Sequence, residues 1–100
     1  MKYKLFNEFA KESTEIFGVE EEDIFTKNKS REVVDSRYLL YYLCKINNIQ
    51  LIYIQNYMKK RGYDIPKSTI HYGIKEVAKK IESDNDYRIH VKRIVQNCIH

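Results

Sequence analysis

The chain has 100 residues, of which 43% are hydrophobic and 32% charged, with three glycines and one proline. This length suits a single domain over residues 1–100, and the composition excludes a collagen-like, linker-rich or disordered chain. No apolar run approaches the roughly 20 residues of a membrane span, and the N-terminus turns acidic before a signal-peptide core could form, so we expect a cytoplasmic protein without a membrane partner.

The net charge of +4 is unevenly distributed along the chain. Residues 1–25 carry three lysines and seven acidic residues, whereas residues 26–100 carry fifteen basic and seven acidic residues. An acidic N-terminal segment followed by a basic remainder of the chain indicates a polyanionic partner for the basic part.

The spacing of apolar residues predicts an all-α fold of five or six short helices, because no segment alternates strictly between apolar and polar residues. Residues 5–17 follow helical spacing, and Gly18 is placed to end that helix. Residues 20–25 can form a second, short helix. Residues 26–31 contain no apolar side chain and predict an exposed basic loop, whose Ser30 can cap the helix that follows.

A longer helix over residues 32–47 has apolar side chains on nearly all sides, which predicts that it is central and buried. Arg37 interrupts this apolar surface, so its charged side chain needs an outward path to solvent or an anionic partner. Five tyrosines of this helix and the next fit the core better than a base-stacking surface: Tyr38, Tyr41, Tyr42, Tyr53 and Tyr57.

Three further helices complete the predicted fold. Residues 51–60 form the first of them, and Gly62 follows its end. The second covers residues 66–82 and begins with Pro66, a residue favoured at the first helical position. Residues 84–86 offer a cap for the last helix.

The helix over residues 66–82 has two different faces. At about 100° per residue, the aliphatic side chains share one stripe: Ile70, Ile74, Val77 and Ile81. The opposite face carries Ser68, Tyr72, Lys75 and Lys79, with His71 at its edge. Lysines that neutralise phosphate, beside groups that reach base edges, are typical of a recognition helix. A merely solvated lysine-rich face would show the same pattern.

A second basic element favours DNA binding over a solvated face. Lys27, Lys29 and Arg31 alternate in the predicted loop, and Arg37 follows roughly one to two turns later. Two basic elements on one small domain predict a two-point clamp, with helix 66–82 in the major groove and the loop along the backbone or in the adjoining minor groove. Helix 51–60 would then be the first element of a helix-turn-helix.

Together, the loop and the two-faced helix resemble the C-terminal DNA-binding domain of the bacterial replication initiator DnaA, a Trp-repressor-like helix-turn-helix domain. The similarity runs from residue 16 to residue 87. Residues 17–25 are similar to the acidic segment that precedes the basic loop in this family. Residues 26–37 are similar to that loop and the start of the long helix, and Ser68-Thr69-Ile70 with Gly73 is similar to the recognition motif.

The resemblance implies roles for single residues. Lys29 stands where the family inserts an arginine into the minor groove, and Arg37 stands in place of an arginine that contacts phosphate and groove. Ser68 and Thr69 match hydroxyl residues that touch bases or phosphates. Lys45 matches a lysine that contacts the backbone.

Three departures from the family imply a changed sequence preference. The family's Asp-His pair is Pro66-Lys67 here, and its second histidine is Tyr72. Residues 59–65 also form a longer connection than the family's tight turn. Initiators carry an ATPase domain upstream, for which 100 residues leave no room, and no Walker phosphate loop is present. We therefore expect a free-standing module that binds no nucleotide.

No catalytic or metal-binding pattern stands out. His71, His90 and His100 lack ligand spacing, and Ser68 has no nucleophile pattern around it. Cys44 and Cys98 are too few for a disulfide framework and predict buried thiols. We expect no enzyme, no cofactor and no metal.

The expected function is sequence-preferring binding of double-stranded DNA, in replication or transcription control. The expected DNA contacts are Lys27, Lys29, Arg31, Arg37, Lys45, Lys67, Ser68, Thr69, His71, Tyr72, Lys75 and Lys79. The alternative is a protein-interaction or structural module whose acidic first helix turns Glu8, Glu12 and Glu15 outward. A composition rich in Lys, Ile, Asn and Tyr, as AT-rich genomes encode, favours a phage or mobile element as source.

Overall fold

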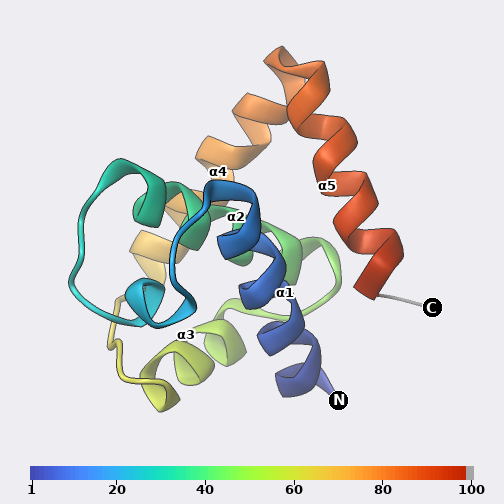
Figure 1. Cartoon of the computed structure of the whole chain (residues 1–100). Helices are drawn as coiled ribbons and strands as arrows, with labels where there is room; N and C mark the ends of the chain where they lie inside the picture. The colour runs from blue at the N-terminus through green and yellow to red at the C-terminus, as the bar shows by residue number, and fades with distance from the viewer. Residues whose placement is uncertain (99–100) are drawn as a thin grey trace.

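The computed structural model describes residues 1–98, which form five α-helices, one short 3₁₀ helix and no strand (Figure 1). The elements are α1 (Lys2–Phe17), η1 (Glu21–Phe25), α2 (Arg31–Ile46), α3 (Leu51–Lys60), α4 (Lys67–Ser83) and α5 (Asn85–Cys98). The predicted all-α fold is confirmed. No helix within residues 1–98 is long and apolar enough to cross a membrane.

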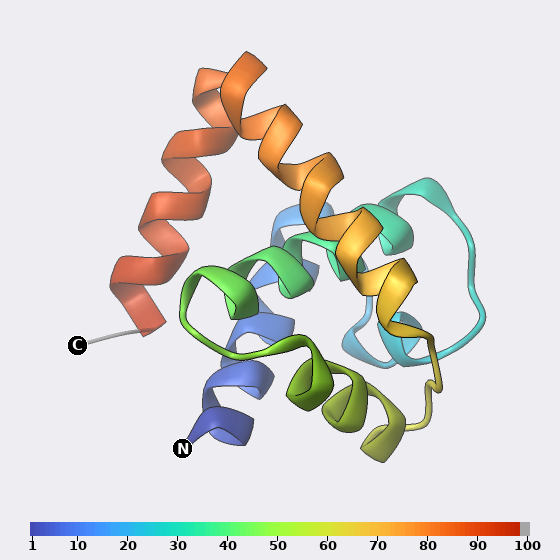
Figure 2. The ribbon, with the colours of Figure 1, turned by 180° about the vertical axis from the view of Figure 1, so that it is seen from behind.

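The central position predicted for α2 is confirmed. α1 packs along one side of α2 and α4 along the other, so that α1 lies in front of α2 in Figure 1 and α4 in front of it in Figure 2. Half of the sixteen residues of α2 are buried. Small polar residues line its contact with α1, where the hydroxyl oxygens of Ser13 and Ser36 are 3.5 Å apart.

The ends of the helices follow from local signals. Gly18 ends α1 in a left-handed conformation, with φ of 64°. Pro66 lies just before α4, in an extended conformation, and not at the first helical position as predicted. Asp84 caps α5 as predicted, because its carboxylate accepts a hydrogen bond of 3.1 Å from the backbone N–H of Tyr87.

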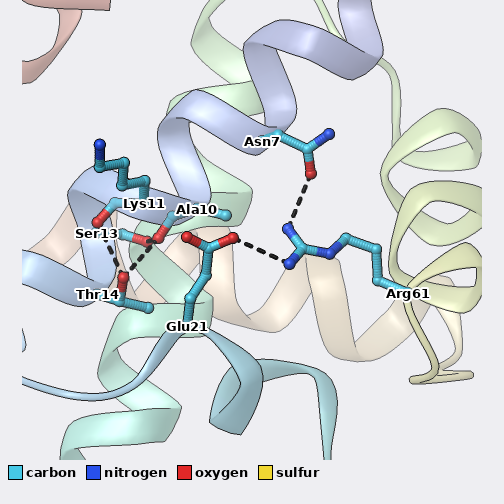
Figure 3. Close-up of polar contacts among 7 residues, drawn as sticks. All are labelled: Asn7, Ala10, Lys11, Ser13, Thr14, Glu21 and Arg61. Carbon is cyan, nitrogen blue, oxygen red and sulfur yellow. Dashed lines mark hydrogen bonds and ion pairs between the residues drawn. The ribbon is translucent and has the colours of Figure 1, made fainter.

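Arg61, directly after α3, connects three elements (Figure 3). Its guanidinium donates to the side-chain oxygen of Asn7 in α1 at 2.9 Å and pairs with Glu21 of η1 at 2.9 Å. The same group lies 4.0 Å from the ring centroid of Phe25. Arg61 therefore joins the end of α3 to the N-terminal part of the chain.

Four of the five tyrosines assigned to the core are wholly or partly buried. Tyr41 is 1% exposed, and Tyr38, Tyr42 and Tyr57 are half-buried. The prediction is wrong for Tyr53, which is 40% exposed. It lies at the edge of the aromatic cluster because its ring stacks on Tyr57 at 6.4 Å and is covered on one side by the ammonium group of Lys2.

Candidate nucleic-acid interface

The loop between η1 and α2 is exposed over residues 26–30, as predicted. Its shape is set by hydrogen bonds between neighbouring residues. The Thr26 hydroxyl donates to the carbonyl of Asp23 at 2.8 Å and accepts from the Asn28 backbone N–H at 3.2 Å. The Asn28 side-chain oxygen accepts from the Ser30 N–H at 2.9 Å. Ser30 occupies the capping position of α2, but its side chain makes no capping hydrogen bond.

The three cations of the loop region are all displayed to solvent. Lys27 and Lys29 are exposed loop residues, and Arg31 is the exposed first residue of α2. The structure thus brings these three predicted site residues together within one short segment.

Arg37 differs from its predicted placement. It is 4% exposed, and its guanidinium donates to the carbonyls of Ile24 at 2.8 Å, Asp23 at 3.2 Å and Thr26 at 2.5 Å. The same group lies 4.7 Å from the ring centroid of Tyr63. The predicted outward path or anionic partner is therefore wrong, since carbonyl dipoles and an aromatic face surround the charge. The DNA contact expected of Arg37 is likewise not available to a residue held in this way.

Arg37 instead holds the start of the basic loop against the connection between α3 and α4. Thr26 begins the basic loop, and Tyr63 belongs to the connection between α3 and α4. The backbone is close there as well, because a Cβ atom on Gly62 would lie 3.7 Å from the carbonyl oxygen of Phe25. The start of the loop and the approach to α4 therefore lie on one side of the molecule, at the left in Figure 1 and the right in Figure 2.

The predicted division of α4 into two faces is confirmed. Ile70, Gly73 and Val77 are buried, and Ile74 and Ile81 are half-buried. The predicted contact residues Lys67, Ser68, His71, Tyr72, Lys75 and Lys79 are exposed, as are Lys80, Glu82 and Ser83 near the end of the helix. Thr69 is half-buried, and its backbone N–H donates to the carbonyl of Pro66 at 3.1 Å.

Tyr72 is 55% exposed, but its ring packs against the ring of Tyr38. The edge of one ring meets the face of the other between Tyr72 and Tyr38, with centroids 6.0 Å apart and planes at 77°. Burial, and then the nearby Tyr72, raise the pKa of Tyr38 above its ordinary value. The Tyr38 phenol therefore remains a neutral hydrogen-bonding group at physiological pH.

Two acidic residues that were not predicted as part of the site lie beside the basic elements, Asp35 in α2 and Glu76 in α4. Asp35 and Glu76 line a small polar hollow of about 200 Å³ together with Arg31 and Lys80. Lys80 lies 4.0 Å from Asp35, and Lys79 pairs with Glu76 at 3.3 Å. Spacing could have signalled both acids, since Asp35 follows Arg31 by one helical turn and Glu76 precedes Lys79 by three residues.

Lys45 lies apart from the other predicted site residues. It is exposed near the opposite end of α2 from Arg31, roughly 21 Å along the helix axis. Its neighbours in a shallow hollow are Asn48, Ile49 and Gln50, none of which belongs to the loop or to α4.

Residues 1–98 contain no group of three or more His, Cys, Asp or Glu side chains that could hold a metal ion. His100 lies outside the described residues. Cys44 is buried, whereas Cys98 is half-buried. Burial, and then the carboxylates of Glu12 and Glu8, raise the pKa of Cys98 to about 11, so this thiol stays protonated at neutral pH.

The loop and the exposed face of α4 are therefore the two basic elements that the fold brings to one side. The resemblance to the initiator domain rests on the motifs in these same elements and stays a prediction. Comparison of the chain with protein-family models, with curated proteins and with solved structures finds no match.

Proposed function

We propose that the protein binds double-stranded DNA with a sequence preference, using α3 and α4 as a helix-turn-helix. The observation that carries the proposal is the exposed polar face of α4 on the same side of the molecule as the exposed loop of Lys27 and Lys29. A major groove admits an α-helix, and an adjoining basic loop can follow the backbone or the minor groove.

The N-terminal half of α4 carries the groups that such a helix needs. Lys67 and Ser68 lie in its first turn, where a cation and a hydroxyl can reach base edges in the major groove. Tyr72 comes one turn later and is kept in place by Tyr38. A supported ring with an exposed hydroxyl suits contact with a base edge or a thymine methyl group, since less conformational entropy is lost on binding.

The loop would supply contacts that do not depend on sequence. Lys27 and Lys29 extend from a backbone that side-chain hydrogen bonds of Thr26 and Asn28 restrain. Lysine acts on phosphate as a point charge and needs no fixed geometry. Arg37 contributes indirectly, because it anchors the first residue of this loop.

The revised interface is smaller than the set predicted from the sequence. It comprises Lys27, Lys29, Arg31, Lys67, Ser68, Thr69, His71, Tyr72, Lys75 and Lys79. Arg37 is a positioning residue, and Lys45 lies outside the interface. Asp35 and Glu76 lower the local positive potential, so we expect binding that is sensitive to salt and of moderate strength.

We further propose that the protein acts in the cytoplasm of a bacterial or phage-infected cell, as a non-enzymatic factor in replication or transcription control. A protein-interaction module is the second candidate. Glu8 and Glu15 are exposed on α1, across α2 from α4, and could meet a basic partner.

A salt titration of binding to mixed-sequence duplexes tests the proposal. We expect the logarithm of the binding constant to fall linearly with the logarithm of salt concentration, because lysines release counterions from the phosphates. Fluorescence anisotropy of labelled duplexes measures this. Dissociation constants that stay weaker than about 10⁻⁴ M at moderate salt would contradict DNA binding. Lys11→Ala is the matched control, since Lys11 is an exposed lysine of α1 on the far side of α2.

A further inference from the structure

A second surface lies away from the loop and from the start of α4, where α2, α4 and α5 meet. The helices enclose a hollow of about 430 Å³. Its apolar lining is Tyr42 and Ile46 of α2, Ile81 of α4, and Val91 and Val95 of α5. Figure 1 shows α5 turning back from the end of α4, so that the two helices form the arms of a V.

The floor of this groove is accessible apolar surface. Ile46 is 45% exposed, and Tyr42, Ile81 and Val95 are half-buried. Apolar side chains that share one concave surface are the usual basis of ligand and helix recognition. The groove thus offers apolar surface that the described residues do not cover.

The charges at the groove are of one sign. Arg88 and Lys92 are the charged residues in its lining, and no acidic residue of the described chain lines it. Arg88 is held in place, because its guanidinium donates to the carbonyl of Ile81 at 3.0 Å and to the Asn85 side chain at 3.2 Å. Arg93 adds a further exposed cation to α5.

We propose that this groove binds an acidic amphipathic helix of a protein partner. The apolar floor would take the apolar stripe of that helix, as in other helix-in-groove complexes. Arg88 and Lys92 would pair with carboxylates on its flank, which favours acidic partners and disfavours basic ones. Duplex DNA is a poorer occupant, because its phosphates would leave the apolar floor without contacts.

A second copy of this chain is also a poorer occupant. α1 buries its own apolar face, including Phe6 and Phe9, and Ile16 is its exposed large apolar side chain. Its exposed charges alternate in sign along Lys4, Glu8, Lys11 and Glu15. Paired copies of α5 would bring like charges together, since α5 carries three cations and one acid.

Two synthetic helical peptides of the same length and apolar stripe test the proposal, one with glutamate and one with lysine on the flanks. The full chain, ¹⁵N-labelled, is titrated with each peptide. We expect the glutamate peptide to bind and to shift amide signals of Ile46, Ile81 and Val95, and the lysine peptide to bind at least about tenfold more weakly. No binding of the glutamate peptide at millimolar concentration, equal binding of both, or shifts elsewhere would overturn the proposal.

Paired variants locate the site. Lys92→Glu replaces an exposed residue and should weaken binding of the glutamate peptide by about tenfold or more. Val95→Glu places a charge on the groove floor and should act likewise. Ile89→Glu is the matched control, because Ile89 is an exposed residue of α5 that does not line the groove. The proposal fails if Ile89→Glu weakens binding as much as Lys92→Glu, or if sedimentation shows self-association that Lys92→Glu abolishes.

Discussion

The ring of Tyr38 lies where a side chain on Gly73 would begin. A Cβ atom built on Gly73 would be 2.5 Å from Cδ1 and 2.9 Å from Cγ of Tyr38. Gly73 is therefore required by the close approach of α4 to α2. The same Tyr38 ring supports Tyr72 on the exposed face of α4, so packing at residue 73 and the placement of Tyr72 depend on one side chain.

Gly73→Ala should lower the free energy of unfolding. Alanine favours a helix by about 1 kcal/mol over glycine, but the added methyl overlaps the base of the Tyr38 ring, and such overpacking costs about 1–3 kcal/mol. We expect a net loss of roughly 1 kcal/mol in urea unfolding. In a Tyr38→Ala background the same substitution should be neutral or stabilising. A single Gly73→Ala variant that is more stable than the parent protein would contradict the observed packing.

Arg37→Met should be much more destabilising than Arg31→Met. Arg37 is buried and supplies donors to three carbonyls, and hydrogen bonds from charged groups contribute about 1.5–3 kcal/mol each. We expect a loss of about 3 kcal/mol or more in the free energy of unfolding. Arg31 is exposed, and its substitution should change stability by less than about 0.5 kcal/mol. Similar losses for the two variants would show that Arg37 does not anchor the loop.

The helices were predictable because their signals are local. Gly18, Gly62 and Asp84 act within one turn of the chain, and the stripe of Ile70 and Val77 depends only on spacing along a single helix. Such patterns place helix ends and inward faces without knowledge of the tertiary structure.

The surroundings of Arg37 were not predictable in the same way. Its acceptors Asp23 and Thr26 lie 14 and 11 residues earlier in the chain, on a different element. The sequence marks Arg37 as a polar break in an apolar helix, but free carbonyls at the end of a 3₁₀ helix are backbone groups that leave no trace in side-chain identity. The same limit applies to Asp35 and Lys80, which meet only because α2 and α4 cross.

Tyr41→Phe should be tolerated at neutral pH. The hydroxyl of Tyr41 is buried and finds no hydrogen-bond partner among the described residues. Because an unpaired buried hydroxyl costs about 1–3 kcal/mol, its removal should leave the free energy of unfolding unchanged or raise it by up to about 1 kcal/mol. A clear loss of stability in urea unfolding at pH 7 would mean that the hydroxyl has a partner in solution.

The same variant should respond differently to alkaline pH. Burial raises the pKa of Tyr41 above its ordinary value of 10, so above pH 10 the phenol ionises in the unfolded chain but stays protonated in the folded one. The unfolded state then releases a proton, and stability falls as pH rises, by at most about 1.4 kcal/mol per pH unit for this group. Urea unfolding at pH 9, 10 and 11 should show that the free energy of unfolding of Tyr41→Phe rises relative to that of the parent protein only above pH 10. A constant difference across this range would contradict the burial of the phenol.

Lys29→Ala and Lys67→Ala should weaken DNA binding in different ways. Lys29 would contact phosphate, so its loss should weaken binding to all duplexes about equally. It should also lower, by about 1, the magnitude of the slope of the logarithm of the binding constant against the logarithm of salt concentration. Lys67 lies in the first turn of α4, so its loss should change which duplexes are selected from a random library. Lys45→Ala and Lys11→Ala should leave both measurements unchanged, because Lys45 lies near the far end of α2 and Lys11 belongs to α1, which packs on the other side of α2 from α4. If Lys29→Ala and Lys67→Ala change affinity and sequence preference alike, the division between backbone contacts and base contacts is wrong. If Lys45→Ala weakens binding as much as Lys29→Ala, the interface extends to the far end of α2.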